Sequence, residues 1–392
     1  MKKVLVPKVR FKGFDNNWEQ GNIGEVFELT RGEVLSQRKI RNKKMGEYIH
    51  PVFSSQTLNN GLLGFYNNFL FKNSITWTTD GANAGTVLYR DGLFYATNVC
   101  GVILQKTSIK PSSYFAHEIN VKVKKHVIKA GNPKLMINVL HEVLINFSKN
   151  KLEQEKISIL IENIDNLITL EQTKLNKLKK VKETLLEKMF PEHNSKKPRI
   201  RFKGFSEEWK EEKFGDTIEP YRLKNHNKEK LTSYSISNKF GFVNQKEFFE
   251  NGGKAIRADK SNSLVVFPNS FAYNPARIDV GSIGLYTKEE KCLVSPIYEV
   301  FKTDRKMNDE FLFNWFKTDE FKWIVNKSKE GSVRNTVYLR NISDYLINIT
   351  SYIEQQKIGD FFSKIDTLLD LYNSKLNKLK QIKEALLQKM FV

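Results

Sequence analysis

Apolar residues recur every three or four positions along two long stretches of the chain, residues 151–190 and 353–392. The spacing alternates between four and three, which is the heptad pattern of a helix that pairs with another helix. At ~1.5 Å per residue each helix would be about 55 Å long, more than one small domain can bury. The expected helix-pairing positions are Ile161, Ile164, Ile168, Leu175, Leu178 and Leu185 in the first stretch and Phe362, Ile365, Leu369, Leu376, Leu379 and Leu386 in the second.

Polar residues interrupt both apolar seams. Lys182 stands at a seam position of the first stretch, Lys383 stands at the corresponding position of the second, and the first stretch also carries Glu171. Pro191 then ends the first helical pattern. We predict that the two helices form an antiparallel coiled coil, because a closed pseudo-two-fold arrangement of two repeats makes equivalent helices run in opposite directions.

Residues 1–150 and 191–352 follow a different pattern. Short apolar and β-branched runs are broken by Gly, Asn and Asp, as in "NSITWTTDGANAGTVLYRDGLFYATNVCGVILQ" and "NSFAYNPARIDVGSIGLYTKEEKCLVSPIYEVF". Such runs predict strands, and helical patches such as "DEFLFNWFKTDEFKWIV" follow them. The predicted fold class is α+β, with two mixed α/β domains separated by two long helices. The aromatic residues Trp77, Tyr273 and Phe271 are expected in the domain cores.

The chain also repeats itself. "KLNKLKKVKETLLEKMF" at residues 174–190 and "KLNKLKQIKEALLQKMF" at residues 375–391 differ at only four of seventeen positions. "RFKGF" occurs at residues 10–14 and again at 201–205, an offset of 191, whereas the long helices are offset by 201. The sequences between these anchors diverge. A cyclic duplication that kept its ends and rewrote its middles explains this pattern, and the middles are where the halves would differ in task.

The charge balance points to a polyanion as the partner. The formal net charge is +20, from 29 Lys and Arg against 17 Asp and Glu in residues 1–191, and 35 against 27 in residues 192–392. Because both halves are basic, a single basic tail does not explain the excess, and the phosphate backbone of a nucleic acid is the commonest polyanion. The opening "MKKVLVPKVRF" is too short for a signal peptide and no run of eighteen apolar residues exists, so we expect a cytoplasmic protein without a membrane segment.

No catalytic or metal-binding motif is present. The chain lacks a phosphate-binding G-x-x-x-x-G-K-[ST] loop and a G-x-G-x-x-G after a strand, and "HEVLI" has Ile145 where a zinc helix needs its second His. Cys100 and Cys292 have no Cys or His at metal-ligand spacing and are interpreted as buried free thiols. "NPAR" at residues 274–277 resembles the Asn-Pro-Pro-aromatic loop of amino-methyltransferases, but it has one Pro and no aromatic residue, which favours a β-turn.

Basic loops recur at equivalent places in the two halves. Such loops can neutralise phosphates and reach base edges, although a solvated charge run is the alternative for either loop alone. A second and weaker pair follows Gly turns, and the "NPAR" turn adds two polar side chains. The candidate DNA-binding residues are therefore Arg31, Arg38, Lys39, Arg41, Lys43, Lys44, Lys134, Arg222, Lys224, Lys228, Lys230, Asn274, Arg277 and Arg334.

These features together resemble the specificity subunit of type I restriction-modification systems. The resemblance rests on "RFKGFDNNWEQGNIGEVFEL" and "RFKGFSEEWKEEKFGDTIE", on "LEQEKI" and "IEQQKI" at the helix starts, and on the repeated "KLNKLK" helix ends. It implies target recognition domains at residues 1–150 and 191–352, each reading one part of a split DNA site. The conserved helices at residues 151–190 and 353–392 would hold these two domains apart. Glu171, a polar residue in the seam, is the chief departure.

The resemblance also implies partners that carry the chemistry. The subunit would perform no reaction itself and would bind no cofactor or metal. It would dock two methyltransferase subunits, which use S-adenosylmethionine, and through them two restriction subunits that use ATP and magnesium. Two other classes of protein stay open at this point: an adenine DNA methyltransferase with its own recognition domain, and a basic coiled-coil scaffold without sequence specificity.

Overall fold

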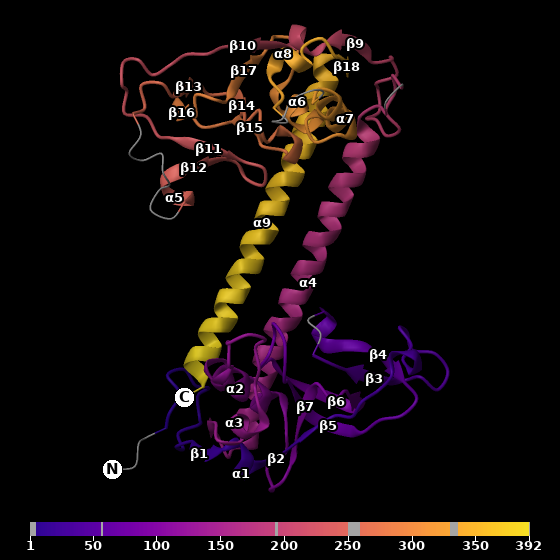
Figure 1. Cartoon of the computed structure of the whole chain (residues 1–392), viewed down its shortest axis with the longest axis vertical. Coiled ribbons are helices and arrows are strands. Elements are labelled where there is room, and N and C mark those ends of the chain that lie inside the picture. Colours follow the sequence, from indigo (N-terminus) through magenta and orange to yellow (C-terminus); the bar gives the residue numbers. More distant parts are fainter. Residues whose placement is uncertain (1–4, 56–57, 193–194, 250–258, 330–335, 392) are drawn as a thin grey trace. The chain divides into compact units, whose positions relative to one another are not determined.

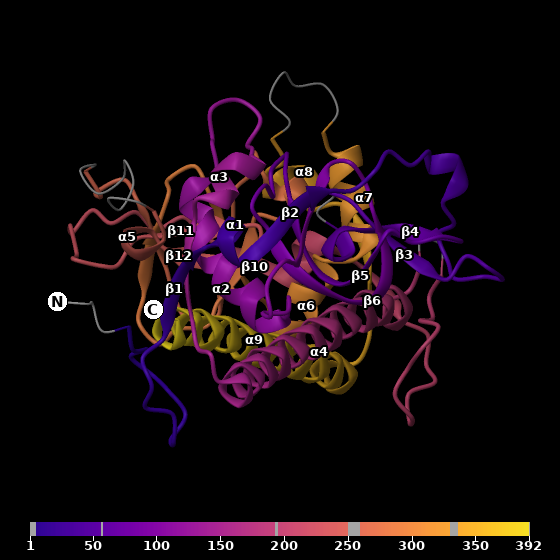
Figure 2. The same cartoon turned by 90° about the horizontal axis from the view of Figure 1, so that it is seen from below.

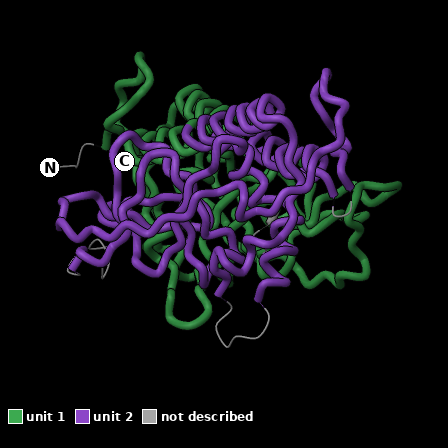
Figure 3. Tube along the Cα trace, turned by 90° about the horizontal axis from the view of Figure 1, so that it is seen from above, with its two compact units in different colours: residues 1–172, 375–392 green, residues 173–374 purple. Residues whose placement is uncertain are grey.

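The computed structural model describes residues 5–55, 58–192, 195–249, 259–329 and 336–391 (Figure 1). Contacts divide the chain into two compact units, which Figure 3 shows in different colours. Unit 1 comprises residues 1–172 with 375–392, and unit 2 comprises residues 173–374. Both long helices are therefore shared, and the units cut across the four linear segments expected from the sequence.

Unit 1 contains a six-stranded sheet in the order β2-β7-β5-β6-β3-β4, in which only β3 and β6 pair in parallel. The short strands β1 and β8 form a separate antiparallel pair. The strands are β1 (Glu19–Asn22), β2 (Phe27–Arg31), β3 (His50–Phe53), β4 (Leu62–Tyr66), β5 (Phe71–Thr78), β6 (Val87–Ala96), β7 (Cys100–Gln105) and β8 (Leu144–Phe147). The short helices are α1 (Ile23–Val26), α2 (Ser113–Val123) and α3 (Ile137–His141), with 3-10 turns η1 (Gln37–Lys39), η2 (Leu58–Gly61) and η3 (Lys124–His126).

The two faces of this sheet have different neighbours because successive side chains of a strand alternate between them. Ile75 and Trp77 of β5 belong to the main core with Phe115 and Ile119 of α2, which lies beside the start of the long helix α4 (Figure 2). On the opposite face, Phe94, Ala96, Cys100 and Val102 form a second cluster with Phe53 of β3. The β3–β4 hairpin thus extends the sheet and helps to cover its second face.

Unit 2 repeats the first four strands of this order as β10-β17-β14-β15 and adds two separate antiparallel pairs, β11-β12 and β13-β16. Its strands are β9 (Lys210–Lys213), β10 (Ile218–Pro220), β11 (Tyr234–Ser237), β12 (Gly241–Asn244), β13 (Leu264–Val266), β14 (Ser270–Tyr273), β15 (Ile283–Tyr286), β16 (Cys292–Val294), β17 (Glu299–Thr303) and β18 (Leu346–Ile349). Its short helices are α5 (Gln245–Phe248), α6 (Asp309–Trp315), α7 (Asp319–Lys327) and α8 (Leu339–Ile342), with 3-10 turns η4 (Phe214–Thr217) and η7 (Ile278–Val280). Tyr234, Leu264, Tyr286 and Val300 share one apolar cluster, so the added strands cover the second sheet face.

The predicted core aromatic residues are buried, and so are both cysteines. Trp77, Tyr273 and Phe271 have no exposed surface, and Cys100 and Cys292 are free buried thiols. Trp77 donates through its indole N–H to Leu135 O at 3.3 Å, and Tyr273 donates through its hydroxyl to Val337 O at 3.0 Å. Trp77 and Tyr273 therefore lie at or next to the end of equivalent strands, β5 and β14, and connect those strands to equivalent later segments of the chain.

The long helices are α4 (Lys151–Met189) and α9 (Tyr352–Met390). In unit 1, Lys383 Nζ donates to Asp165 Oδ1 at 2.6 Å, so the end of α9 lies against the first half of α4. In unit 2, Lys182 forms the corresponding ion pair with Asp366. In both units one helix contributes its start and the other its end, which confirms the predicted antiparallel pairing and cyclic repeat.

The junctions of the repeat have the same geometry in both units. Val9 N–H donates to Lys389 O at 2.9 Å, and Ile200 N–H donates to Lys188 O at 2.8 Å. These residues differ by the repeat offsets of 191 and 201. Strand β1 pairs with β8 as β9 pairs with β18, with the equivalent partners Glu19↔Phe147 and Lys210↔Ile349. One junction is made along a continuous chain and the other between the beginning and the end of the sequence.

Candidate DNA-binding surface

Buried arginine–glutamate pairs lock each "RFKGF" motif onto the start of a long helix. Arg10 donates to both carboxylate oxygens of Glu153 at 2.6 and 2.9 Å, and Arg201 does the same to Glu354 at 2.6 and 2.7 Å. Both glutamate side chains are completely buried. The hydrogen bond to Glu153 raises the pKa of Arg10, so this guanidinium stays charged. These residues build the frame that carries the recognition domains and are not available to DNA.

The first basic loop leaves the sheet at Arg31, the last residue of β2. Arg38 and Lys39 form the η1 turn, and Arg41 pairs with Phe65 of β4 through two backbone hydrogen bonds of 2.8 and 2.9 Å. The guanidinium of Arg41 lies 4.9 Å from the ring centroid of Tyr48 and donates to Arg38 O at 3.0 Å. The loop is thus anchored to the β3–β4 hairpin. Its exposed cations are Arg31, Arg38, Lys39, Arg41, Lys43 and Lys44.

The second basic loop leaves the sheet of unit 2 at the same point, after β10. The guanidinium of Arg222 donates to the carbonyl oxygens of Pro296 and Tyr298, which ties its exposed side chain to the loop between β16 and β17. Asn225 is buried and closes a turn by donating to Glu229 O at 3.1 Å and accepting from Glu229 N–H at 2.9 Å. This turn places Lys228 in the left-handed region, with φ of 52°.

The structure brings Lys228 and Lys230 together around a hollow of about 340 Å³ that Lys260 also lines. Lys224 lies beside it, with its Nζ 3.5 Å from Asn262 Oδ1. Lys260 was not predicted, because it is separated from the basic loop by thirty residues and follows no periodic pattern. Long-range pairing of Lys224 with Leu264 is what places the two segments side by side.

The weaker candidates occupy turns. Lys134 is exposed and its backbone pairs with Ile128 and Asp80. Arg277 N–H donates to Asn274 O at 2.9 Å, and Asn274 Oδ1 accepts from Ala276 N–H at 3.1 Å, so "NPAR" is the β-turn favoured by the sequence. Arg277 is exposed and Asn274 is half-buried. Arg334 lies outside the described residues.

Arg90 is a cation that sequence reasoning missed. Its guanidinium lies 3.7 Å from the ring centroid of Phe53 and donates to Thr76 Oγ1 at 2.9 Å and Asn60 O at 2.7 Å. Burial lowers its pKa to about 10, and within the described residues it forms no ion pair with a carboxylate. A single Arg in the middle of a strand gives no sequence signal for DNA binding. Only the folded sheet shows that, among the described residues, no carboxylate pairs with Arg90.

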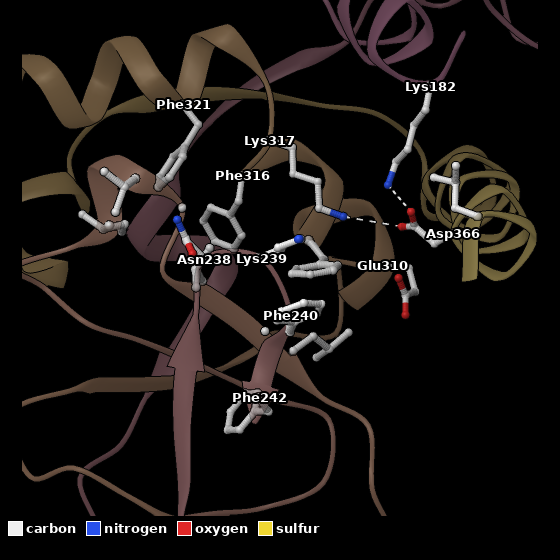
Figure 4. A pocket seen from close by; sticks show the side chains of 18 of the residues that line it. Lys182, Asn238, Lys239, Phe240, Phe242, Glu310, Phe316, Lys317, Phe321 and Asp366 are labelled. Atoms are coloured by element: carbon white, nitrogen blue, oxygen red, sulfur yellow. Dashed lines mark hydrogen bonds and ion pairs between the residues drawn. The ribbon is translucent and has the colours of Figure 1, made fainter. Parts of the chain in front are cut away.

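The seam lysines are explained by charge pairs between the helices. In Figure 4, Lys182 and Lys317 both point at Asp366, with Lys317 Nζ 3.7 Å from Asp366 Oδ2. Burial lowers the pKa of Lys317 to about 8. In unit 1, Glu171 is buried and accepts from Lys375 Nζ at 2.9 Å, which accounts for the polar seam position.

The expected pairing residues differ in burial along the helices. Ile161 lies in the main core of unit 1 with the α2 side chains, and Leu175 and Leu369 are buried in unit 2. The buried members are Ile161, Ile164, Leu175, Phe362, Ile365, Leu369 and Leu376, and the half-buried members are Ile168, Leu178, Leu185, Leu379 and Leu386.

Each unit also leaves large apolar side chains exposed on the long helices. In unit 1 they are Leu152, Ile159, Leu167 and Leu170 of α4 with Ile382 of α9; in unit 2 they are Ile353, Leu368 and Leu371 of α9 with Val181 of α4. At ~100° per residue, the four side chains of α4 in unit 1 fall within a sector about 80° wide. All but Ile159 have an apolar equivalent 201 residues away, so both units present the same exposed apolar face.

The described residues contain no group of three or more His, Cys, Asp or Glu side chains arranged to hold a metal ion. His117 is half-buried in unit 1, and the burial of its ring lowers its pKa to about 4, which keeps it neutral. None of the described helices is long and apolar enough to cross a membrane.

A family model described as "Type I restriction modification DNA specificity domain" matches residues 15–180 and again residues 206–381. The chain belongs to this type I restriction-modification DNA specificity family. The two matches coincide with the two halves of the internal repeat. This assignment favours the specificity subunit over a self-sufficient methyltransferase or a scaffold without sequence specificity.

Two relatives from Mycoplasma pneumoniae, both named as type I specificity subunits, support the assignment. S.MpnORF507P is 27% identical over 344 residues, covering 86% of each chain. The S.MpnORF289P N-terminus is 39% identical over 142 residues, which are 36% of this chain and 74% of the relative. A crystal structure of the type I restriction-modification system S subunit from M. genitalium has a TM-score of 0.65 at 17% identity and covers 99% of each chain. That structural likeness shows the fold of the specificity subunit.

Proposed function

We propose that each unit of this specificity subunit reads one part of a bipartite DNA target. The observation that carries the proposal is that one frame occurs twice with different additions. The Arg–Glu pairs, the helix junctions and the four-strand order are repeated, whereas the segments covering the second sheet face differ. A repeated frame with two different surfaces suits a protein that reads two unlike sequences.

The two basic loops are the proposed sites of DNA contact. Both begin after the first strand of the main sheet, at the end of β2 or β10, and both lead into the unit-specific strands. Exposed Arg and Lys side chains of these loops would neutralise phosphates and position each domain on the duplex. Lys260, which lines the same hollow as Lys228 and Lys230, joins the contact set of unit 2.

The exposed apolar helix faces are the proposed docking sites for methyltransferase subunits. Leu167 and Leu170 in unit 1 have the equivalents Leu368 and Leu371 in unit 2, and all four are exposed. A surface present twice in one chain suits two copies of one partner, because each copy meets the same residues. We infer two methyltransferase subunits for each specificity subunit, with two restriction subunits joined through them.

The chemistry is assigned to those partners. The methyltransferase subunits would use S-adenosylmethionine, and the restriction subunits would use ATP and magnesium. The specificity subunit would then contribute recognition and assembly without catalysing a step. Its DNA partner implies that it acts in the cytoplasm, where a bacterial or archaeal chromosome lies.

Methylome sequencing of cells with and without this chain tests the proposal. A bipartite methylated motif that requires the chain is expected, and exchange of residues 24–140 with those of another family member should change only one half of it. Exchange of residues 215–340 should change only the other half. Methylation that persists without the chain, or a motif indifferent to both exchanges, would contradict the proposal.

A further inference from the structure

Exposed aromatic residues meet where the turn of the β11–β12 hairpin lies against the short helix α5. Phe240 belongs to the turn, Phe248 is the last residue of α5, and Phe249 follows it. Phe240, Phe248 and Phe249 are 60%, 48% and 42% exposed. Their rings touch in sequence, with centroids 6.0 Å apart between Phe240 and Phe248 and 5.2 Å apart between Phe248 and Phe249. We call these three residues the aromatic tip. They form one continuous apolar patch, and such patches mark interaction sites more often than isolated exposed side chains do.

The stem below this tip is fixed to the sheet. The ring of Phe242 packs 5.0 Å from that of Tyr286, and a Cβ added to Gly284 would lie only 2.9 Å from the Phe242 ring. Ser282 Oγ donates to Ile236 O at 2.8 Å. The rings are therefore presented on a preorganised support, so little conformational entropy would be lost when they bind.

Two lysines lie beside the aromatic tip, with the exposed Glu247 between Lys246 and Phe248 along the chain. Lys239 Nζ lies 5.2 Å from the ring centroid of Phe240, and Lys246 is exposed between Phe240 and Phe248 along the chain. Figure 4 shows Lys239, Phe240 and Lys317 among the side chains that line a pocket of about 1090 Å³, together with the acidic Glu310 and Asp366. Apolar rings flanked by ammonium groups complement DNA, which offers flat apolar bases between rows of phosphates.

The place of the tip in the repeat favours DNA over a protein partner. The β11–β12 hairpin belongs to the unit-specific strands, whereas unit 1 extends its main sheet with β3 and β4 instead. A protein that meets both units alike would use surfaces present in both, such as the exposed helix faces. What differs between the units in the proposed function is the DNA sequence each one reads.

We propose that the aromatic tip acts as a wedge that unstacks one base step in the half-site read by unit 2. Phe240 and Phe248 would contact the exposed base faces, while Lys239 and Lys246 would lie on the flanking phosphates. Apolar side chains inserted beside a base step kink the duplex in this way, and the deformability of the step then contributes to specificity. This inference rests on the proposed function and identifies one contact through which unit 2 would recognise its half-site.

The test uses the complete chain co-expressed with its cognate methyltransferase subunits, on duplexes containing the motif mapped in cells. 2-Aminopurine placed at successive positions of the unit 2 half-site reports unstacking through its fluorescence. The test variant is the double substitution Phe240→Ala, Phe248→Ala. Phe240→Tyr, which keeps the ring, is the conservative variant, and Leu346→Ala removes a similarly exposed apolar side chain, 55% exposed, from strand β18.

We expect wild type, Phe240→Tyr and Leu346→Ala to brighten 2-aminopurine at one position of this half-site. The double variant should lose that signal and bind its target roughly tenfold to a hundredfold more weakly, since one or two base–aromatic contacts disappear. Its salt dependence should not change, because no phosphate contact is removed. If the double variant unfolds, Phe240→Ala alone replaces it, because this ring packs least against the domain.

Unchanged affinity, or weaker binding without loss of the fluorescence signal, would overturn the wedge. So would loss of assembly with the methyltransferase subunits, which would assign the tip to a protein contact. Failure of the proposed function looks different, because wild type itself would then show no preference for any mapped motif.

Discussion

Units 1 and 2 share one structural frame and differ in the strands that are attached to it. Both have a buried Arg–Glu pair, a Lys–Asp pair between the long helices, and the same order of four strands, β2-β7-β5-β6 in unit 1 and β10-β17-β14-β15 in unit 2. Unit 1 then widens its sheet with β3 and β4, whereas unit 2 covers its sheet with two separate strand pairs. The comparison shows that contacts between the repeated ends of the two halves hold each unit together. The divergent segments between these ends are therefore free to change.

The shared frame also explains how the middles can vary without loss of the fold. Glu153 and Glu354 lie at helix starts, and their Arg partners lie in the "RFKGF" motifs, so neither pair involves the unit-specific strands. Trp18 and Trp209 pack edge-on against Phe391 and Phe190, the last residues of the kept helix sequence. Each unit is therefore closed by residues from both repeats.

Breaking a frame contact should have the largest effect. Glu153→Ala leaves the Arg10 guanidinium buried without its carboxylate, which should cost about 3–5 kcal/mol of unfolding free energy in unit 1. Glu354→Ala should do the same in unit 2, because its geometry is equivalent. Urea unfolding monitored by fluorine NMR of 5-fluorotryptophan-labelled protein separates Trp18 from Trp209. Equal losses reported by both tryptophans in either variant would show that the units do not unfold separately.

Glu118→Gln should separate the units by their pH dependence. Glu118 of α2 is buried in unit 1, and burial raises its pKa from 4.5 to about 7. Glu118 lies four residues after Tyr114, which packs against Trp18. The equivalent position in unit 2 is Trp315, four residues after Phe311, which packs against Trp209, so unit 2 has no ionisable group there. The folded state keeps the Glu118 carboxyl protonated up to a higher pH than the unfolded chain does. The free energy of unfolding of the wild type therefore falls as pH rises from about 4.5 to about 7. Glutamine cannot ionise and still accepts from Asn146 N–H.

The variant should therefore gain up to about 3 kcal/mol over wild type in unit 1 at pH 8 and little at pH 4.5. Thermal unfolding at both pH values, followed at Trp18, measures the difference. Trp209 serves as the internal control, because unit 2 should not respond. A stabilisation that is equal at the two pH values would mean that packing, and not ionisation of Glu118, is responsible.

The two basic loops allow units 1 and 2 to be compared by their contributions to DNA binding. The triple variant Arg38→Ala, Lys39→Ala, Arg41→Ala should weaken binding roughly tenfold to a hundredfold and reduce the slope of log K against log salt by about one unit per lost phosphate contact. Lys224→Ala, Lys228→Ala, Lys230→Ala is the matched variant of unit 2. Fluorescence anisotropy at several salt concentrations gives both slopes. An unchanged slope would assign that loop to solvent.

The smallest change in unfolding free energy should come from the Lys–Asp pairs between the long helices. Unit 2 adds one lysine, Lys317, to its pair. Asp366→Asn leaves Lys182 and Lys317 without their shared carboxylate, whereas Asp165→Asn removes the carboxylate from Lys383 alone. We expect Asp366→Asn to be more destabilising by about 1 kcal/mol, a modest value because Asp366 is partly exposed.

This difference should fall as pH rises above about 8, because Lys317 then loses its proton in the folded state while the unfolded chain keeps it up to about 10.5. Denaturant unfolding at pH 7 and pH 9.5 compares the two variants. A difference that grows with pH would contradict the assignment of the effect to charged Lys317.

The sequence by itself determined the long helices, the repeat and the basic loops. These are local patterns: a heptad spacing is read over neighbouring residues, and Lys182 with Lys383 could be recognised as equivalent interruptions of one seam. The "NPAR" turn could be predicted for the same reason, because Asn and Pro bias their own backbone. The family resemblance added the division of labour between domains and helices.

Only the tertiary structure decided which distant segments meet. The partner of Arg10 is 143 residues away, the hollow around Lys228 needs Lys260, and the isolated charge of Arg90 follows from what lies across the sheet. The sharing of each long helix between two units likewise depends on contacts between α4 and α9. Such pairings are set by packing and loop closure across the whole chain, for which a linear spacing carries no signal.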